Sequence, residues 1–244
     1  MSAIRFLTTP KGYLPQYSYI LGKPEPLDTE INNVACYWLG TMLHLDIQKG
    51  NEAMKTLNFQ KYIGGTAACM KRLMMVTKGC GQLTSNDTYF ANSWFSGVKM
   101  AEEAMAEGVD YCGPVKTSHK GFCLAILEKL IKYFPAGSYL VLRSTPRVPG
   151  DIPLMAIGYK YISRKVLGFI ATDGDGSTEP CDTYSPCFPD IYSNVSVHYI
   201  FCPRLLGRYL NACDEIDNQN RIRQSDLALE KYWVTHSGYF RLAT

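Results

Sequence analysis

The chain has 244 residues, of which 46% are hydrophobic and 12% are aromatic. This content is enough to bury one large domain, or a core that carries an insertion, and it excludes a disordered tail. Charged residues make up 19% of the chain, and the formal net charge is +3. So small a charge permits binding to nucleic acid but does not indicate it.

Cysteine usage and the N-terminal residues favour an intracellular protein. The nine cysteines are an odd number, form no C-x-x-C pair and lie near no pair of histidines, which is typical of reduced thiols. Residues 1–14 contain Arg5, Pro10 and Lys11 and lack the apolar run of a signal peptide. No stretch approaches the roughly 20 apolar residues of a membrane span. We therefore expect a nuclear or cytoplasmic protein without a membrane partner.

Strand and helix signals alternate along the first half of the chain. Residues 33–48 favour two paired strands that are interrupted at Gly40, because apolar and polar residues alternate in this segment. A helix is predicted from the break at Gly64 to Gly79. The elements that follow are a strand running into a turn at 83–95, a helix that opens at Ser96 and closes at Gly108, and a strand at 110–118.

The second half is predicted to add a helix, several strands and a final helix. In the helix at 123–134 the residues Leu127, Leu130, Ile131 and Phe134 share an apolar face. The remaining elements are short antiparallel strands at 138–144, 155–163 and 165–172, a loop at 173–189, and a helix from about 203 to 233.

Two motifs carry a resemblance to a known family. Residues 89–97 read Y-F-A-N-S-W-F-S-G, and residues 209–221 read Y-L-N-A-C-D-E-I-D-N-Q-N-R. Together they resemble the piggyBac transposases. In that family the second catalytic aspartate lies in the strand-end motif D-N-W-F-T-S, and the third lies in the helix motif Y-N-x-x-M-G-G-V-D-x-x-D-Q. K-P-E-P near the start and S-R-K-V-L-G-F-I-A-T later in the chain match further segments of the family in the same order.

The alignment assigns family positions to residues of this chain. Asp217 is the counterpart of the third aspartate, and Asn92 stands where the family has its second. Ser93 occupies the next position, an asparagine in the family, whereas Trp94 and Phe95 match. The first aspartate of the family is expected upstream of the first residue.

The resemblance implies an α/β fold, with a ribonuclease H-like mixed sheet flanked by helices and an inserted strand-rich subdomain. Residues 1–121 and 198–244 would form the core, without its first strand, and residues 122–197 would form the insertion. A sheet that lacks a strand exposes an edge and apolar faces. We therefore also expect marginal stability or self-association.

For catalysis, the resemblance implies an incomplete set of carboxylates. Members of this class use two divalent cations about 4 Å apart, held by carboxylates. Mg²⁺, the metal of the active family, prefers anionic oxygen ligands, and Asn92 offers a neutral oxygen. Asp217 is left as a vestigial catalytic and metal-binding residue. We expect no cofactor and no cleavage of DNA.

Two further aspartates leave an alternative open. Asp46 lies on the polar side of a predicted strand, and Asp87 precedes the strand that leads to Asn92. If either converged with Asp217 within metal-sharing distance, the chain would be an active nuclease. Ordinary solvent-facing charges are the other interpretation of these two residues.

Basic residues with interleaved tyrosines give a case for weak binding to DNA. They can pair with phosphates and stack on bases, although each alone is also typical of a mixed surface. The candidate DNA-binding residues are Lys116, Lys120, Arg164, Lys165, Arg221 and Arg223, and Lys160 belongs to the same wider group. The sequence thus predicts a transposase-derived protein that is catalytically inactive. The alternative is a domesticated DNA- or protein-binding module that retains the scaffold.

Overall fold

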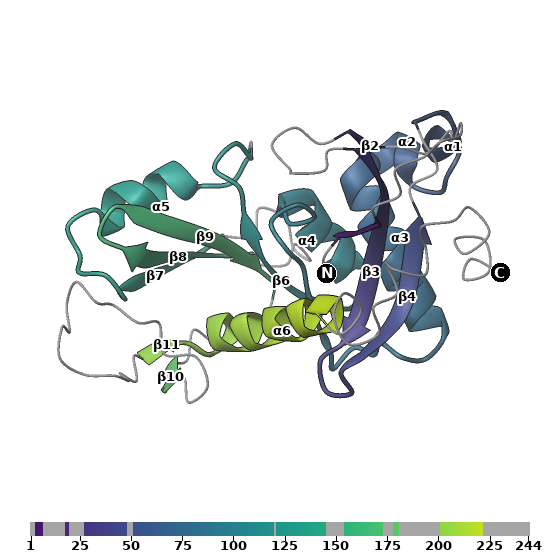
Figure 1. The fold of residues 1–244 in the computed structure, drawn as a ribbon. Coiled ribbons are helices and arrows are strands. Elements are labelled where there is room, and N and C mark those ends of the chain that lie inside the picture. The colour runs from purple at the N-terminus through teal and green to yellow at the C-terminus, as the bar shows by residue number, and fades with distance from the viewer. Residues whose placement is uncertain are drawn as a thin grey trace. The chain divides into compact units, whose positions relative to one another are not determined.

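The computed structural model describes residues 3–6, 18–19, 27–47, 51–119, 121–144, 154–172, 178–180 and 201–221. The chain divides into two compact units, each with its own sheet. The first unit comprises Met1–Gln82 and Asp214–Thr244, and the second comprises Leu83–Cys213. The boundary at Cys213 falls within one helix, α6 (Arg204–Arg221), which Figure 1 shows in yellow-green.

An antiparallel sheet lies in the first unit. The long strands β3 (Leu27–Cys36) and β4 (Thr41–Ile47) pair with each other, and β3 also pairs with the short strands β1 (Ala3–Phe6) and β2 (Ser18–Tyr19). Gly40 has a φ of 58° in the turn between β3 and β4, a left-handed conformation that favours glycine. The structure confirms the two predicted strands and their interruption at Gly40.

Three helices follow β4 in the first unit. They are α1 (Asn51–Lys55), α2 (Gln60–Ile63) and α3 (Gly65–Gly79). The longest, α3, has the predicted boundaries and begins directly after Gly64, whose φ is 81°. It packs against β3 and β4, so its apolar side chains form the core of this unit.

A five-stranded mixed sheet forms the centre of the second unit. Its strand order is β5-β6-β9-β8-β7, with β5 and β6 parallel and all other neighbours antiparallel. The strands are β5 (Thr88–Phe90), β6 (Asp110–Val115), β7 (Tyr139–Arg143), β8 (Met155–Ile162) and β9 (Lys165–Ala171). The helix α4 (Val98–Ala106) connects β5 to β6, since parallel neighbours need a crossover. The structure thus confirms a mixed sheet flanked by helices.

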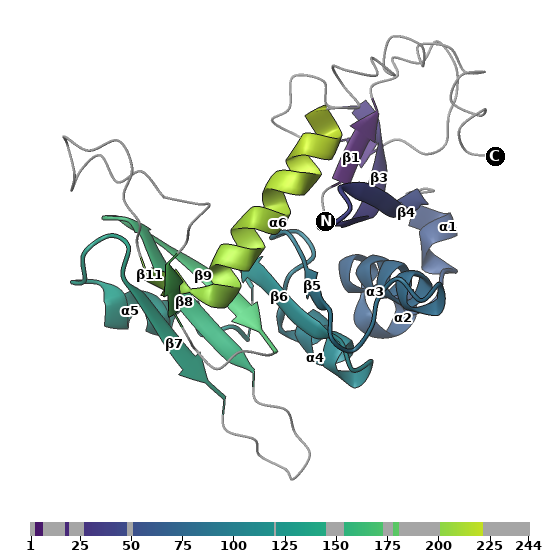
Figure 2. The ribbon, with the colours of Figure 1, turned by 90° about the horizontal axis from the view of Figure 1, so that it is seen from below.

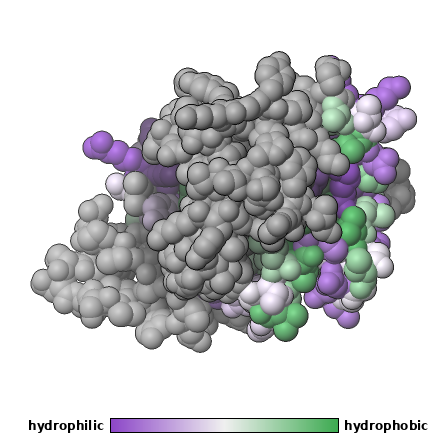
Figure 3. Space-filling view, turned by 45° about the vertical axis from the view of Figure 1, so that its right-hand side comes forward, coloured by the Kyte–Doolittle hydropathy of each residue, from purple (hydrophilic) through white to green (hydrophobic). Residues whose placement is uncertain are grey.

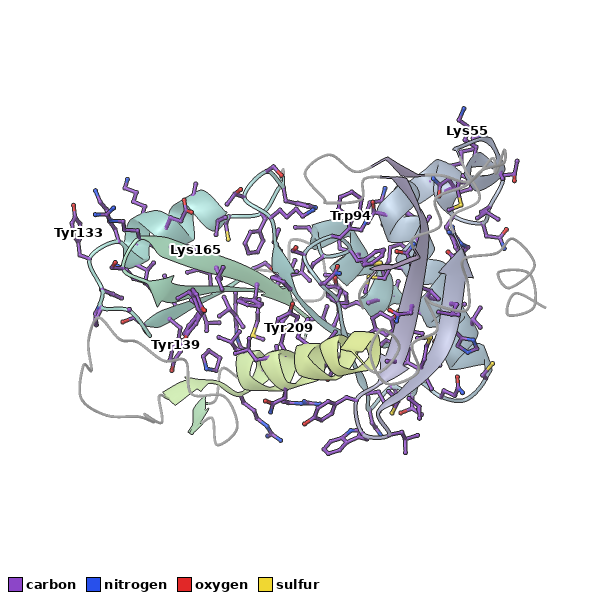
Figure 4. The ribbon with its side chains drawn as sticks, in the orientation of Figure 1. Lys55, Trp94, Tyr133, Tyr139, Lys165 and Tyr209 are labelled. Carbon is purple, nitrogen blue, oxygen red and sulfur yellow. The ribbon has the colours of Figure 1, made fainter. Side chains whose placement is uncertain are left out.

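Helices cover both faces of this sheet (Figures 1 and 2). On one face lie α4 and α5 (Leu124–Ile131). A Cβ atom added at Gly158 would lie 3.1 Å from the Cβ atom of Leu127, so α5 approaches β8 closely. On the other face, Tyr209 of α6 packs edge-on against Phe169 of β9, with 5.2 Å between the ring centroids (Figure 4). The sheet is therefore buried on both sides.

The predicted apolar face of α5 is partly wrong. Leu130 and Phe134 are 50% and 47% exposed, whereas the buried residues of the helix are Leu124, Leu127 and Ile131. Residues spaced by three and four positions lie on one side of a helix, and that side begins at Leu124. The helix also ends at Ile131, so Phe134 does not continue its face.

A short strand replaces part of the predicted loop at 173–189. The strand β10 (Thr178–Pro180) pairs with β11 (Phe201–Pro203), which lies about 20 residues later along the chain. A pairing partner so far away leaves no signal in the local sequence, so the prediction was wrong for these three residues. The helix α6 begins as predicted, and its predicted continuation beyond residue 221 lies outside the described residues.

The strands β7 to β9 lie in the range predicted to be a separate insertion. They join β5 and β6 in one sheet, because β9 pairs with β6 from Ala171 opposite Cys112 to Gly168 opposite Val115. The two compact units therefore have boundaries different from those of the predicted core and insertion. The division into core and insertion stays a prediction. The edge strands of this sheet are β5 and β7, and self-association also stays a prediction.

Hydrophobic side chains also occur on the surface of the described residues. Trp38 and Leu39, in the turn between β3 and β4, are 84% and 72% exposed. Figure 3 shows hydrophobic residues in green between hydrophilic residues in purple, and such scattered exposure is common in folded proteins. None of the helices in the described residues combines the length and the apolar composition of a membrane span.

Tyr111, Cys112 and Tyr209 are buried ionisable groups of the second unit. Burial raises the pKa of Tyr111, of Cys112 and of Tyr209 well above the ordinary values, because an apolar interior disfavours the charged form. All three groups are therefore uncharged in the folded chain at neutral pH.

We predict that the free energy of unfolding falls as the pH rises above about 8.5, the ordinary pKa of a cysteine thiol. The unfolded chain then releases protons that the folded chain retains, which favours unfolding. Cys112 alone lowers the free energy of unfolding by about 1.4 kcal/mol for each pH unit above that value. The tyrosines add to this slope above about pH 10. Urea denaturation at a series of pH values measures the effect.

The variant Cys112→Ala is the control for this prediction. It removes one buried thiol, so the fall in the free energy of unfolding between about pH 8.5 and 10 should be shallower than in the unmodified chain. An identical pH dependence in both proteins contradicts the assignment to Cys112.

Candidate functional site

The candidate site lies at one edge of the five-stranded sheet. The parallel strands β5 and β6 end at Phe90 and Val115, so the turns at 91–97 and 116–119 leave the sheet at the same edge. Open α/β sheets bind ligands beyond the carboxyl ends of their parallel strands. The edge therefore brings the family-like motif around Asn92 next to the basic segment that starts at Lys116.

Asn92 holds the turn that follows β5. Its side-chain Oδ1 accepts hydrogen bonds from the backbone N–H of Trp94 at 3.0 Å and of Phe95 at 3.3 Å. Its backbone carbonyl accepts hydrogen bonds from Phe95 and Ser96, at 3.2 and 3.1 Å. The amide oxygen of Asn92 is thus engaged by two backbone donors, as is usual for asparagine in turns.

The turn also packs tightly against β6. The Tyr111 hydroxyl donates a hydrogen bond of 3.1 Å to Ser96 Oγ, and both side chains are buried. Gly113 has no room for a Cβ atom, which would collide with Ser96 Oγ and lie 2.7 Å from the carbonyl oxygen of Ala91. Contacts with backbone atoms cannot relax by a side-chain rotation, so β6 fixes the position of the turn.

The two loops of the edge touch each other at Gly97. A Cβ atom at this glycine would collide with the imidazole ring of His119. The loop after β6 therefore lies directly against the start of α4. His119 Nδ1 is buried without a hydrogen-bond partner.

Trp94 and Lys116 form a cation–π pair at this edge. The Nζ atom of Lys116 lies 4.3 Å from the centroid of the indole ring, within the range in which the ring attracts a cation. Trp94 remains 56% exposed, and Lys116 is also exposed. Figure 4 labels Trp94.

Exposed cations continue along the same edge of the sheet. β9 runs antiparallel to β6, so Lys165, its first residue, and Arg164 in the preceding turn lie at the end where Lys116 leaves β6. Figure 4 labels Lys165. The carboxyl end of α5 reaches this edge too, because Lys160 Nζ near the end of β8 donates a hydrogen bond of 2.6 Å to the carbonyl of Lys132. We call this set the basic edge; it comprises Lys116, Lys129, Lys132, Arg164 and Lys165.

Lys160 is not a DNA-contacting residue, which corrects its place among the candidate basic residues. It is 5% exposed and donates hydrogen bonds to the carbonyls of Ile131 and Lys132. A cation at this position satisfies the last carbonyls of α5 and interacts favourably with the helix dipole. Residues 157–160 of β8 are all buried, so no alternation of buried and exposed residues in the strand signalled this role.

Sequence reasoning missed two members of the basic edge. Lys129 and Lys132 belong to the end of α5, and the signal was the pattern E-K-L-I-K near the predicted end of a helix. Which sheet edge that helix end reaches depends on the register of β8 and β9, which the sequence does not show. Lys120 and Arg223 lie outside the described residues. Arg221 ends α6, and its side chain is not described.

The two alternative carboxylates are engaged elsewhere. Asp46 forms an ion pair of 2.7 Å with Arg72 of α3, and the two side chains are 17% and 14% exposed. It is therefore not the solvent-facing strand residue that one interpretation expected. Asp87 Oδ2 accepts hydrogen bonds from the backbone N–H and the hydroxyl of Thr84, at 2.8 and 2.7 Å. Asp46 belongs to the first unit and Asp87 to the second.

The described residues around Asn92 do not fit a pair of magnesium ions. Such a site needs several anionic oxygens, and the turn offers a neutral amide whose oxygen already accepts two hydrogen bonds. Lys116 adds a positive charge nearby. Within the described part of the chain, no three histidine, cysteine or acidic side chains are grouped as metal ligands. Asp217 lies in α6, and its side chain is not among those described.

Comparison with known proteins supports a piggyBac-like fold. No protein-family model matches the sequence, and no curated protein matches it. A piggyBac transposase chain, solved by cryo-electron microscopy in a synaptic complex with hairpin DNA, matches with a TM-score of 0.61 and 17% sequence identity. The match covers 88% of this chain and 38% of the transposase chain. This chain therefore has a piggyBac-like α/β fold and spans about two fifths of that protein's length.

We predict that Asn92→Ala lowers the free energy of unfolding by about 1 kcal/mol, because two backbone donors of the turn lose their acceptor. Asn92→Asp should cost less than Asn92→Ala, since a carboxylate oxygen accepts the same two hydrogen bonds. Urea denaturation measures both. The exposed neighbour Ser93→Ala is the matched control and should change stability little. An Asn92→Ala protein as stable as the Ser93→Ala protein contradicts the role of Asn92 in the turn.

Proposed function

We propose that this chain is a transposase-derived protein that binds DNA through the basic edge and does not cleave it. The observation that carries the proposal is the state of Asn92. It stands at the end of β5, where the resemblance places a catalytic aspartate, and its oxygen stabilises a turn. In this proposal the chain keeps the transposase scaffold and its binding to DNA, and it lacks the cleavage of DNA.

Charge supports the binding half of the proposal. Lys116 follows the end of β6, and Lys165 begins the neighbouring strand β9, two residues beyond the position opposite Lys116. The lysines of α5 extend the row of cations along the same edge. Duplex DNA carries one negative charge per about 1.7 Å of helix axis, so several cations along one edge can contact several phosphates. The similar transposase chain was solved with hairpin DNA, which also favours DNA as the partner.

The donor set supports the absence of cleavage. Positioning two divalent cations requires carboxylates that converge on one point. Asp46 neutralises Arg72, and Asp87 holds the turn before β5. Moving either into a metal site would leave the partly buried Arg72 unpaired or open the Thr84 turn. Asp217 remains a vestigial ligand in this proposal.

A second candidate function is binding of a protein partner. One observation favours it: the outer side of α5 and the turn that follows the helix carry large apolar side chains that are 47–85% exposed. They are Ile126, Leu130, Tyr133 and Phe134. Exposed apolar groups that cluster on one helix side often mark interaction surfaces. This function would be compatible with DNA binding at the basic edge.

We predict that the purified chain does not nick supercoiled or hairpin DNA with Mg²⁺ or Mn²⁺. It should retain the DNA at low salt and release it as salt rises, because phosphate contacts displace counterions. Asp217→Ala should behave like the unmodified chain. Lys165→Gln should reduce the slope of log affinity against log salt by about 1. Gel analysis of nicking and fluorescence anisotropy of binding are the measurements.

Lys61→Gln, an exposed lysine of α2 in the first unit, is the matched control because it removes the same charge outside the basic edge. Metal-dependent nicking that is lost in Asp217→Ala contradicts the proposed absence of catalysis. Equal salt slopes for Lys165→Gln and the unmodified chain contradict the basic edge as the DNA contact.

A further inference from the structure

Contacts with phosphates do not require the exposed side chain of Trp94. This residue is 56% exposed, although the next residue, Phe95, is 3% exposed and anchors the turn. Cations are sufficient for contacts with a nucleic acid backbone. An exposed aromatic ring on a fixed turn offers something else, a flat surface on which another ring can stack.

The backbone holds this ring at a defined place. The N–H of Trp94 donates to Asn92 Oδ1 at 3.0 Å, and the turn behind it is packed against Gly113 and Ser96. Tryptophan has few rotatable bonds, so ordering it on binding costs little conformational entropy. The turn therefore presents the ring in advance of any ligand.

Lys116 places a positive charge beside the ring. Its Nζ atom lies 4.3 Å from the ring centroid, and Trp94 as a whole residue stays 56% exposed with the lysine in this position. The next two residues, Thr117 and Ser118, are also exposed, and their hydroxyl groups are of the type that contacts phosphate oxygens. An exposed aromatic side chain thus lies next to a short segment that carries one cation and two hydroxyl groups.

We propose that Trp94 and Lys116 bind an unpaired nucleotide, with its base stacked on the indole and its phosphate next to the lysine. This inference rests on the proposed function and refines it. Stacking on aromatic side chains is tolerant of sequence because every base has a flat π face. In a duplex both faces of a base are already stacked on its neighbours, so the site selects single strands, ends or extruded bases.

The test compares a 20-nucleotide single strand of thymidines with a 20-base-pair duplex, both labelled, by fluorescence anisotropy with the full chain. Trp94→Ala should weaken binding of the single strand by about fivefold or more, because loss of one stacked base has this effect in other proteins. Its affinity for the duplex should change by less than about twofold, since phosphate contacts persist. Trp94→Phe should retain most of the single-strand affinity.

Lys116→Gln gives a second, independent readout. It should reduce the salt slope for the single strand by about 0.7, the value for one phosphate contact, and leave the stacking surface in place. A strand of uridines in parallel identifies the source of the nucleotide: a larger loss with Trp94→Ala for one polymer assigns the site to DNA or to RNA. Thermal unfolding of each variant confirms that it is folded, and the exposure of Trp94 makes this the expected result.

The outcomes separate this inference from the proposed function. In one outcome all variants bind the duplex, and Trp94→Ala leaves the affinity for both single-stranded polymers unchanged. This outcome overturns the nucleotide site, but the proposed DNA binding still stands. If Trp94→Ala weakens binding of the single strand and of the duplex equally, the nucleotide site is also overturned, because Trp94 then contacts the sugar–phosphate backbone. Failure of the unmodified chain to bind either polymer at low salt overturns both.

Discussion

The parallel pairing of β5 with β6 determines where the site of this chain can lie. Because the two strands point the same way, the turn that begins at Ala91 and the loop that begins at Lys116 leave the sheet together. The absence of a side chain at Gly113 allows the turn to settle on β6, with Ser96 and Tyr111 hydrogen-bonded beneath it. The contacts proposed for Trp94 and Lys116 depend on this local packing, which lies wholly within the second unit.

The chemistry of the edge follows from one amide. An asparagine at the end of β5 satisfies the turn as an aspartate does, but it adds no negative charge to attract a divalent cation. Lys116 lies beside the indole of Trp94, and the turn at 91–97 contains no carboxylate that could neutralise its charge. The turn and Lys116 together consequently carry a positive charge. That is the reverse of what a two-metal cleavage site requires.

Much of the fold follows from glycine positions and apolar spacing, which are local signals. Gly64 and Gly108 adopt left-handed backbone conformations at helix boundaries, as their positions in the sequence predict. The motif Y-F-A-N-S-W-F-S-G lies where the sequence predicts a strand running into a turn, and the structure has this turn at Asn92. The piggyBac-like fold was likewise predicted from motifs and is supported by the structural similarity.

What the sequence could not show depends on contacts between distant residues. Lys160 reads as one more surface cation, and the hydrogen bond to the end of α5 makes it a buried cap. Asp46 reads as a strand charge, and its partner Arg72 lies 26 residues later. Lys132 joins the basic edge because the register of β8 with β9 brings the end of α5 there. None of these pairings is encoded in periodicity or in short motifs.

Hydrogen–deuterium exchange with and without a saturating thymidine strand tests most directly whether nucleic acid binds at this edge. The account predicts slower amide exchange at residues 92–97 and 116–119 in the complex, with little change in the antiparallel sheet of the first unit. Protection confined to the first unit, or to the outer side of α5, with unchanged exchange at 92–97 and 116–119, would contradict it.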